Sequence, residues 1–206
     1  IRAYIVKSFP DDGIIGEEFK EKKTKNKNYW IIDPIDGTKA FVAGLPTWSN
    51  LVGMIYKKKS IIGMANFPEL KKTYISYNNA SYILDKNKKK KLKTNSVINL
   101  KKTKILCNFH NQNINFKILK KIDKLNKNIS RITLDAFGYC LLAEGKLDAV
   151  IESNLKIYDV AAIIPIVENA GGFITTWNNK NAEKAGNILA TSNKKLHYKL
   201  LKILKR

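Results

Sequence analysis

The chain has 206 residues, of which 44% are hydrophobic and 10% aromatic, a composition typical of a folded globular protein. Its apolar stretches are too short to span a bilayer, and its charged first residues do not resemble a signal peptide, so we expect no membrane partner. The formal net charge is +21, yet only three of the 38 basic residues are arginines. Nucleic-acid-binding surfaces usually use arginine, and no RNA-module signature is present, so we expect a lysine-rich surface and no nucleic-acid partner.

The first half of the chain reads as short β-type segments after an opening helix at residues 1–9. That segment looks like the middle of a helix, so we expect residues that precede it to be missing. Apolar runs bounded by turn residues predict strands at 29–33, 49–57, 60–67 and 72–77. The lysine-rich run Lys86–Lys93 predicts an exposed loop or hairpin where this meander ends.

The second half alternates strand-like and helix-like segments. Strands are predicted at 103–109, 147–151, 173–177 and 187–192, and helices at 115–127, 136–144, 159–170 and 194–206. This alternation favours a layered α/β architecture. We expect an N-terminal α+β part at 1–100 and a C-terminal α/β part at 101–206, forming one catalytic unit. Cys107 and Cys140 lie in apolar stretches without metal-type spacing, which favours free buried thiols and a cytoplasmic location.

Three acidic elements stand out in this basic chain: Glu17 and Glu18 in "GEE", Asp33 and Asp36 in "DPIDGT", and Asp159 in "YDVAA". Carboxylates are the hard oxygen ligands that Mg²⁺ prefers, and paired ions of this kind serve phosphoryl transfer. Each element also has a simpler interpretation. "GEE" is typical of a solvated loop, Asp-Pro of a turn, and an aspartate before a helix of an N-cap.

The local chemistry of "DPIDGT" suits a metal and phosphate site. Pro34 biases Asp33 toward an extended backbone, so that Asp33 can point off a strand end. Gly37 allows a ligand to approach the backbone closely. If Thr38 begins a helix, the N–H groups of Gly37 and Thr38 form a phosphate cradle, and the Thr38 hydroxyl is placed to orient a water molecule.

"GEEF", "WIIDPIDGTKAFVAGLPTWSN" and "YDVAAIIPIVENAGG" resemble, in order and approximate spacing, the three signature regions of the inositol-monophosphatase-like, lithium-sensitive phosphatases. The resemblance implies a layered α/β/α/β/α sugar-phosphatase sandwich, here without its N-terminal helical segment, that commonly forms a homodimer. It implies two or three Mg²⁺ ions, with Mn²⁺ as an alternative. The implied metal ligands are Glu17, Asp33, the carbonyl of Ile35, Asp36 and Asp159, with Glu18 the weaker member of its pair. The implied catalytic residues are Glu17, Asp33 and Thr38, and the implied phosphate-binding residues are Gly37 and Thr38.

Within that family the chain is more similar to the histidinol-phosphate phosphatase branch than to the inositol branch. The features that carry this are "GLP-x-W" after the metal motif, Tyr158 before the last aspartate, Asp135 and Glu152. The resemblance makes Asp135, Glu152 and Tyr158 substrate-binding, and an aspartate suits a substrate with an ammonium and an imidazole group. The sequence departs from the branch because "TLD" at 133–135 replaces "GGD". A helix N-cap is the alternative role for Asp135.

These residues together predict a Mg²⁺-dependent phosphomonoesterase that hydrolyses L-histidinol phosphate in histidine biosynthesis. Inositol monophosphate, or another sugar or nucleotide phosphate, is the alternative substrate. A non-catalytic, basic nucleic-acid-binding protein is the alternative outside this class.

Overall fold

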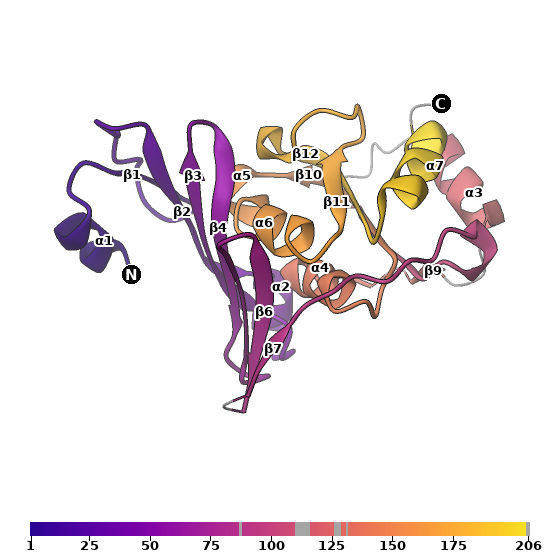
Figure 1. The fold of residues 1–206 in the computed structure, drawn as a ribbon, viewed down its shortest axis with the longest axis horizontal. Coiled ribbons are helices and arrows are strands. Elements are labelled where there is room, and N and C mark those ends of the chain that lie inside the picture. The colour runs from indigo at the N-terminus through magenta and orange to yellow at the C-terminus, as the bar shows by residue number, and fades with distance from the viewer. Residues whose placement is uncertain (87, 110–115, 126–128, 131, 205–206) are drawn as a thin grey trace.

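The computed structural model describes residues 1–86, 88–109, 116–125, 129–130 and 132–204, which form two β-sheets separated and flanked by helices (Figure 1). The first sheet has seven strands in chain order. They are β1 (Gly13–Gly16), β2 (Asn28–Asp36), β3 (Ser49–Tyr56), β4 (Lys59–Phe67), β5 (Lys72–Tyr77), β6 (Ala80–Asp85) and β7 (Lys88–Lys91). β1 is parallel to β2, and the remaining strands form an antiparallel meander.

The second sheet has the strand order β11-β12-β10-β8-β9. Its strands are β8 (Ile105–Phe109), β9 (Ile129–Ser130), β10 (Ala149–Leu155), β11 (Phe173–Thr176) and β12 (Gly186–Thr191). β8 lies parallel to β10 and β9, whereas β12 runs antiparallel to β10 and β11. The carboxyl ends of β8 and β10 therefore meet at one edge of this sheet.

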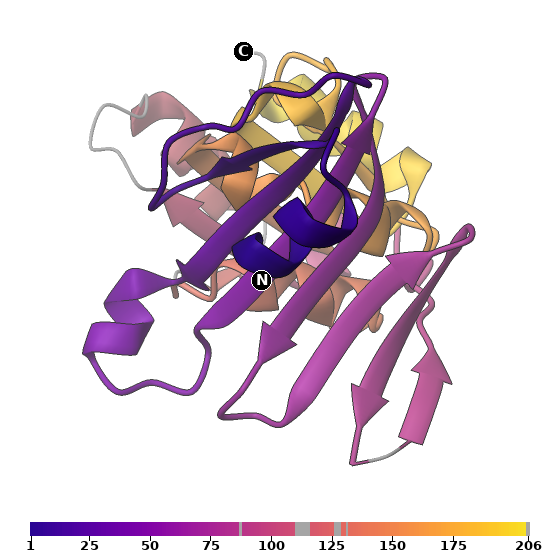
Figure 2. The same ribbon diagram turned by 90° about the vertical axis from the view of Figure 1, so that its left-hand side faces the viewer.

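The helices complete five layers (Figure 1). They are α1 (Arg2–Ser8), α2 (Thr38–Val42), α3 (Phe116–Leu125), α4 (Ala136–Ala143), α5 (Ile157–Val160), α6 (Ile163–Glu168) and α7 (Lys194–Leu204), with 3₁₀ turns at Leu100–Lys102 and Ala182–Lys184. α4, α5 and α6 lie between the sheets and enclose the larger hydrophobic core. α3 and α7 cover the outer face of the second sheet, and α1 lies on the outer face of the first (Figure 2). This is the α/β/α/β/α sandwich that the resemblance implies.

Most predicted strands and helices are present, and the differences have local causes. β6 was not predicted, although Asn78 and Asn79 have φ values of 48° and 57° and join it to β5 in a tight hairpin. Positive φ at both loop residues is the signature of a type I′ turn, which asparagine tolerates. The lysine-rich run does form a hairpin, in which β7 is the exposed edge strand.

The single helix predicted from Asp159 is in fact two helices, α5 and α6, separated at Ala161 and Ala162. Pro165 explains the break. It has no N–H to donate to the carbonyl of Ala161, four residues earlier, and its ring crowds that carbonyl. The prediction of a continuous helix was therefore wrong.

The junction between α5 and α6 rests on two paired glycines of the first sheet. Gly53 of β3 and Gly63 of β4 lie directly opposite each other. A Cβ at Gly63 would lie 1.9 Å from the carbonyl oxygen of Ala162, and a Cβ at Gly53 would lie 2.8 Å from the amide nitrogen of Ala162. The missing side chains therefore allow the chain that carries Asp159 to contact the backbone of the sheet.

A buried histidine of α7, His197, packs against the second sheet. Its two ring nitrogens lie 2.8 Å from the hydroxyl of Thr175 and 3.0 Å from the hydroxyl of Thr191. Burial lowers the pKa of His197 to about 4, because the protein interior disfavours the charged imidazolium. Among the residues that the structure describes, none of the helices has the length and apolarity needed to cross a lipid bilayer.

Candidate metal and phosphate site

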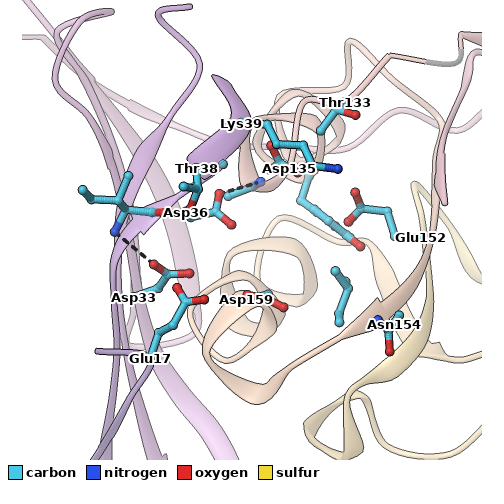
Figure 3. Close-up of a pocket in the computed structure, with 15 residues that line it drawn as sticks. Glu17, Asp33, Asp36, Thr38, Lys39, Thr133, Asp135, Glu152, Asn154 and Asp159 are labelled. Atoms are coloured by element: carbon cyan, nitrogen blue, oxygen red, sulfur yellow. Dashed lines mark hydrogen bonds between the residues drawn. The ribbon is translucent and has the colours of Figure 1, made fainter. Parts of the chain in front are cut away.

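A pocket opens where the two sheets approach each other, and all three acidic motifs reach it (Figure 3). The N-terminal half of the chain contributes the end of β2, the start of α2 and Glu17, which follows β1. The other half contributes the start of α4, the end of β10 and α5. The lining residues are Glu17, Asp33, Ile35, Asp36, Gly37, Thr38, Lys39, Thr133, Asp135, Ala136, Tyr139, Glu152, Asn154, Leu155 and Asp159.

Asp33, Asp36 and Asp159 form the centre of the site. Each offers a carboxylate oxygen, and these oxygens all lie within 4.8 Å of one another. Asp33 and Asp36 are only 2% and 7% exposed. Glu17 is exposed and lies at the rim beside Asp33 (Figure 3).

A β-bulge turns Asp33 and Asp36 toward the same side. Residues three apart in a regular strand point to opposite faces of the sheet. Here Asp33 pairs with Leu51 and Asp36 with Ser49, so β2 contains one residue more than β3 between these pairs. The amide of Ile35 donates to Asp33 Oδ1 at 3.0 Å, and the carbonyl of Pro34 accepts from Asn50 Nδ2 at 2.7 Å. These bonds satisfy the irregular backbone and fix the orientation of Asp33.

Asp36 joins the two halves of the molecule. Its Oδ2 accepts from the hydroxyl of Ser49 at 3.2 Å and from the amide of Ala136, the first residue of α4, at 3.0 Å. Asp135 occupies the N-cap position of α4 but makes no side-chain capping bond. The carboxylate of Asp36 therefore satisfies the end of this helix, and the N-cap alternative for Asp135 is not supported.

Asp159 also serves a helix terminus, although not as an N-cap. It is the third residue of α5, and its Oδ2 accepts from the amide of Lys156 at 2.6 Å. This bond anchors the side chain at the helix end while the residue faces Asp33 and Asp36.

Gly37 and Thr38 occupy the expected positions at the start of α2. Gly37 is the N-cap residue with φ of 77°, a left-handed conformation that suits glycine. A Cβ there would also lie 2.9 Å from Asp135 Oδ2. Thr38 donates its hydroxyl hydrogen bond to the carbonyl of Ile35 at 3.2 Å. The turn therefore brings Thr38 and the Ile35 carbonyl together.

The wall formed by the start of α4 and the end of β10 contains Asp135 and Glu152, and Asp135 lies next to Asp36 (Figure 3). Glu152 lies near the end of β10 and is 1% exposed. Tyr139 of α4 is also buried in this wall. Its hydroxyl makes no hydrogen bond of good geometry with the described residues, yet it faces Glu152, and burial followed by the charge of Glu152 raises its pKa well above the usual value. Tyr158, in contrast, is not among the described residues that line the pocket, although burial and then the charge of nearby Glu17 raise its pKa.

Sequence reasoning did not identify Lys39, Tyr139, Asn108 and Asn154. Asn108 and Asn154 share a signal that was available, because both are polar residues near the ends of apolar strands, β8 and β10. Ligand sites in α/β proteins lie at the carboxyl ends of parallel strands. Nothing in the sequence placed Tyr139, which lies inside an apolar helix.

The electrostatics of the cluster fit a divalent cation. Burial and then the charge of Glu17 raise the pKa of Asp33 to about 7, while burial and then the charge of Asp135 raise the pKa of Asp36 well above its usual range. Burial, with Glu18, also raises the pKa of Glu17. Converging buried carboxylates resist ionisation unless a positive charge joins them, and a bound metal ion supplies that charge.

A model of the inositol monophosphatase family matches residues 1–206. The chain belongs to the inositol monophosphatase family. Members of this family are metal-dependent phosphatases, that is, phosphoric monoester hydrolases.

Two relatives illustrate the range of the inositol monophosphatase family. The bifunctional phosphatase IMPL2 of Arabidopsis chloroplasts is 33% identical over 195 residues, which cover 91% of this chain and 55% of the relative. The histidinol-phosphatase of Mycobacterium tuberculosis is 29% identical over 205 residues, which cover 93% of this chain and 75% of the relative. The chain thus spans little more than half the length of the first relative.

Solved structures of the inositol monophosphatase family share the fold. The extragenic suppressor protein SuhB of Bartonella henselae is 25% identical, with a TM-score of 0.87 over 99% of this chain and 84% of that one. An inositol monophosphatase of Zymomonas mobilis is 26% identical, with a TM-score of 0.87 over 100% of this chain and 79% of that one.

The raised pKa of Asp33 predicts that stabilisation by Mg²⁺ grows with pH. Without metal, the folded protein binds more protons than the unfolded chain between about pH 4 and pH 7, so Asp33 lowers the free energy of unfolding as pH rises, by up to about 4 kcal/mol. Bound Mg²⁺ removes this cost. We therefore expect Mg²⁺ to raise the melting temperature more at pH 7.5 than at pH 5, as measured by calorimetry.

His197 requires a control in this experiment. Its folded-state pKa is lowered to about 4, so its contribution to stability increases as pH rises through the same range, opposite in sign to that of Asp33. Comparing Mg²⁺-loaded and Mg²⁺-free protein at each pH cancels the His197 contribution. An Asp33→Asn variant should show a smaller Mg²⁺ stabilisation that depends less on pH, because Asp36 and Glu17, whose pKa values are also raised, remain. Equal stabilisation of the wild-type chain at both pH values would contradict the prediction.

Proposed function

We propose that this protein is a Mg²⁺-dependent phosphomonoesterase that hydrolyses L-histidinol phosphate to L-histidinol and phosphate, a step of histidine biosynthesis. The observation that carries the proposal is one pocket with two groups of carboxylates. Asp33, Asp36 and Asp159 converge in it, Asp135 lies next to Asp36, and Glu152 lines the side formed by β10. A phosphate ester whose leaving group is cationic matches both groups. Similarity to the histidinol-phosphatase of Mycobacterium tuberculosis supports this choice of substrate.

The chain's own groups have distinct tasks in this mechanism. Asp33, Asp36, Asp159, Glu17 and the carbonyl of Ile35 would hold two or three Mg²⁺ ions, with Mn²⁺ as an alternative. When bound, these ions supply Lewis-acid stabilisation of phosphate oxygens and lower the pKa of a bound water. Each hydrolysis consumes one water, whose oxygen bonds to phosphorus as the P–O ester bond breaks.

In this mechanism Glu17 and Thr38 orient the attacking water, and Glu17 accepts its proton. Glu17 lies at the rim beside Asp33 (Figure 3). Burial and then the charge of Glu18 raise the pKa of Glu17, which is the direction that suits a general base working near neutral pH. The hydroxyl of Thr38 is held against Ile35 at the start of α2. The backbone N–H groups of Gly37 and Thr38 lie at the N-terminal end of α2, which carries a partial positive charge, and would bind the phosphate.

The wider setting of the proposal follows from the same residues. Cys107 and Cys140 are both buried and free, which supports a reducing, cytoplasmic compartment. The family resemblance supports a homodimer. The two sheets, one at residues 13–91 and one at 105–191, support the division into two parts that share one site.

A phosphate-release assay with Mg²⁺ tests the proposal. We expect kcat/KM for histidinol phosphate to exceed that for inositol 1-phosphate and for an adenosine bisphosphate by at least about tenfold, because charge-assisted hydrogen bonds to a cation are strong. Preference for inositol 1-phosphate would reassign the substrate. Absence of turnover with every ester, together with tight, salt-dependent binding of RNA, would contradict the assignment as an enzyme.

A further inference from the structure

Asn108 lies behind the residues that line the pocket, and its amide contacts the two carboxylates of the wall formed by the start of α4 and the end of β10. Nδ2 donates to Glu152 Oε1 at 2.9 Å and to Asp135 Oδ1 at 3.4 Å. Asn108 is 7% exposed, so these contacts are made away from bulk water. The three residues belong to β8, β10 and the turn before α4, which are separate in the sequence.

Thr133 fixes the orientation of this amide. The Thr133 hydroxyl donates to Asn108 Oδ1 at 3.3 Å. The carboxylates can only accept, so they select the NH₂ end of the amide, and the Thr133 hydroxyl, which can also donate, then holds its oxygen end. Thr133 is the first residue of "TLD", the stretch that departs from the related "GGD" pattern, so this chain has a side chain where that pattern has none.

The amide of Asn108 lies between the carboxylates of Asp135 and Glu152, which carry like charges. Asp135 and Glu152 both approach Asn108 Nδ2, and two carboxylates at such short range repel each other in a poorly hydrated site. A hydrogen bond to a charged acceptor is worth about 1.5–3 kcal/mol, more than a neutral one. An amide that donates to both carboxylates favours their adjacency, and adjacent carboxylates form a strong site for an organic cation.

We propose that Asn108, oriented by Thr133, is a positioning residue that holds Asp135 and Glu152 as a paired site for the cationic part of the leaving group, an ammonium or an imidazolium. This inference rests on the proposed function and identifies the part of the substrate that the wall recognises. Asn108 acts through the two carboxylates. Its loss therefore weakens binding of a cationic ester without slowing the chemical step.

The test compares Asn108→Leu, which keeps the size but removes the donor, with Thr133→Val. For Asn108→Leu we expect KM for histidinol phosphate to rise at least about tenfold, the loss of about 1.4 kcal/mol of binding. kcat and the KM for glycerol 2-phosphate, whose leaving group is neutral, should change less than about threefold. Thr133→Val should show the same selective rise in KM, but smaller. Asn95→Leu is the matched control, because Asn95 also donates to a buried carboxylate, Asp148, away from the pocket.

Two outcomes would overturn the inference: an equal rise in KM for both esters, or a loss confined to kcat. If the wild-type enzyme hydrolyses other esters but ignores histidinol phosphate, the proposed function fails, and crystal structures then decide the positioning role. Separation of the Asp135 and Glu152 carboxylates in Asn108→Leu would support the role, and unchanged carboxylates would refute it. If Asn108→Leu does not fold, Thr133→Val carries both measurements, because Thr133 is exposed and its change preserves shape.

Discussion

Replacing Asp36 with asparagine is expected to lower kcat/KM by more than about 100-fold while the metal-free protein stays folded. Changes to groups around a metal ligand typically cost 10–100-fold, and Asp36 is placed as a ligand itself. The folded state should tolerate the change, because the amide oxygen of asparagine can still accept from Ala136 and Ser49. Removing a carboxylate whose pKa is raised by burial, Asp135 and Asp33 should leave stability equal or slightly higher.

Three measurements separate the metal-binding role of Asp36 from a structural one. Circular dichroism and melting without metal report the fold, titration calorimetry reports Mg²⁺ binding, and phosphate release reports turnover. Asp11→Asn is the control, since Asp11 pairs with Lys25 at an exposed position away from the pocket. Unfolding of Asp36→Asn would show that Asp36 is mainly structural. Full Mg²⁺ affinity in a folded variant would show that Asp36 is not a ligand.

Replacing Gly63 with alanine is expected to weaken both the fold and the metal site, although Gly63 does not line the pocket. The new Cβ would lie 1.9 Å from the carbonyl oxygen of Ala162, so the α5–α6 junction must move away from the sheet. Overpacking of this kind typically costs about 1–3 kcal/mol. Asp159 lies three residues before Ala162, and a displacement of about 1 Å at a site can lower activity about 100-fold. We expect lower unfolding free energy and weaker Mg²⁺ binding together.

Gly186→Ala distinguishes this effect from general destabilisation. Gly186 has φ of 85° but no atom within 4 Å of an added Cβ, so alanine there strains the backbone without pressing on a neighbour. It should lower the unfolding free energy while the folded protein keeps its Mg²⁺ affinity, measured by calorimetry well below the melting temperature. Wild-type Mg²⁺ affinity in Gly63→Ala would mean that the glycine pair does not set the position of Asp159.

Local patterns predicted most of the strands and the layered α/β class, and the family resemblance added the full set of residues in the aspartate cluster. They gave no reason for Asp33 and Asp36 to face the same way, because the extra residue in β2 is defined only by its pairing with β3. They also missed the break between α5 and α6. Pro165 lies in the middle of the predicted helix, but the apolar run around it keeps helical periodicity. Here local sterics outweighed the pattern.

The wall that contains Asp135 and Glu152 was the least predictable part of the site. Asn108 meets Asp135 and Glu152 across 27 and 44 residues, and contacts at such separations depend on how the strands assemble. Tyr158 came from the branch resemblance. It is not among the described residues that line the pocket, and its role in substrate binding stays a prediction.

The hydrogen bond from the amide of Ala136 to Asp36 joins the first sheet to α4 beside the aspartate cluster. Because the cluster takes Asp33 and Asp36 from one sheet unit and Asp159 from the other, a cation that binds there also fastens the two units to each other. The free energy of metal binding then appears as resistance to opening along their junction. Chelation is therefore expected to loosen the α4–α6 layer against β2–β4, so that loss of the metal lowers the stability of the protein as well as its activity.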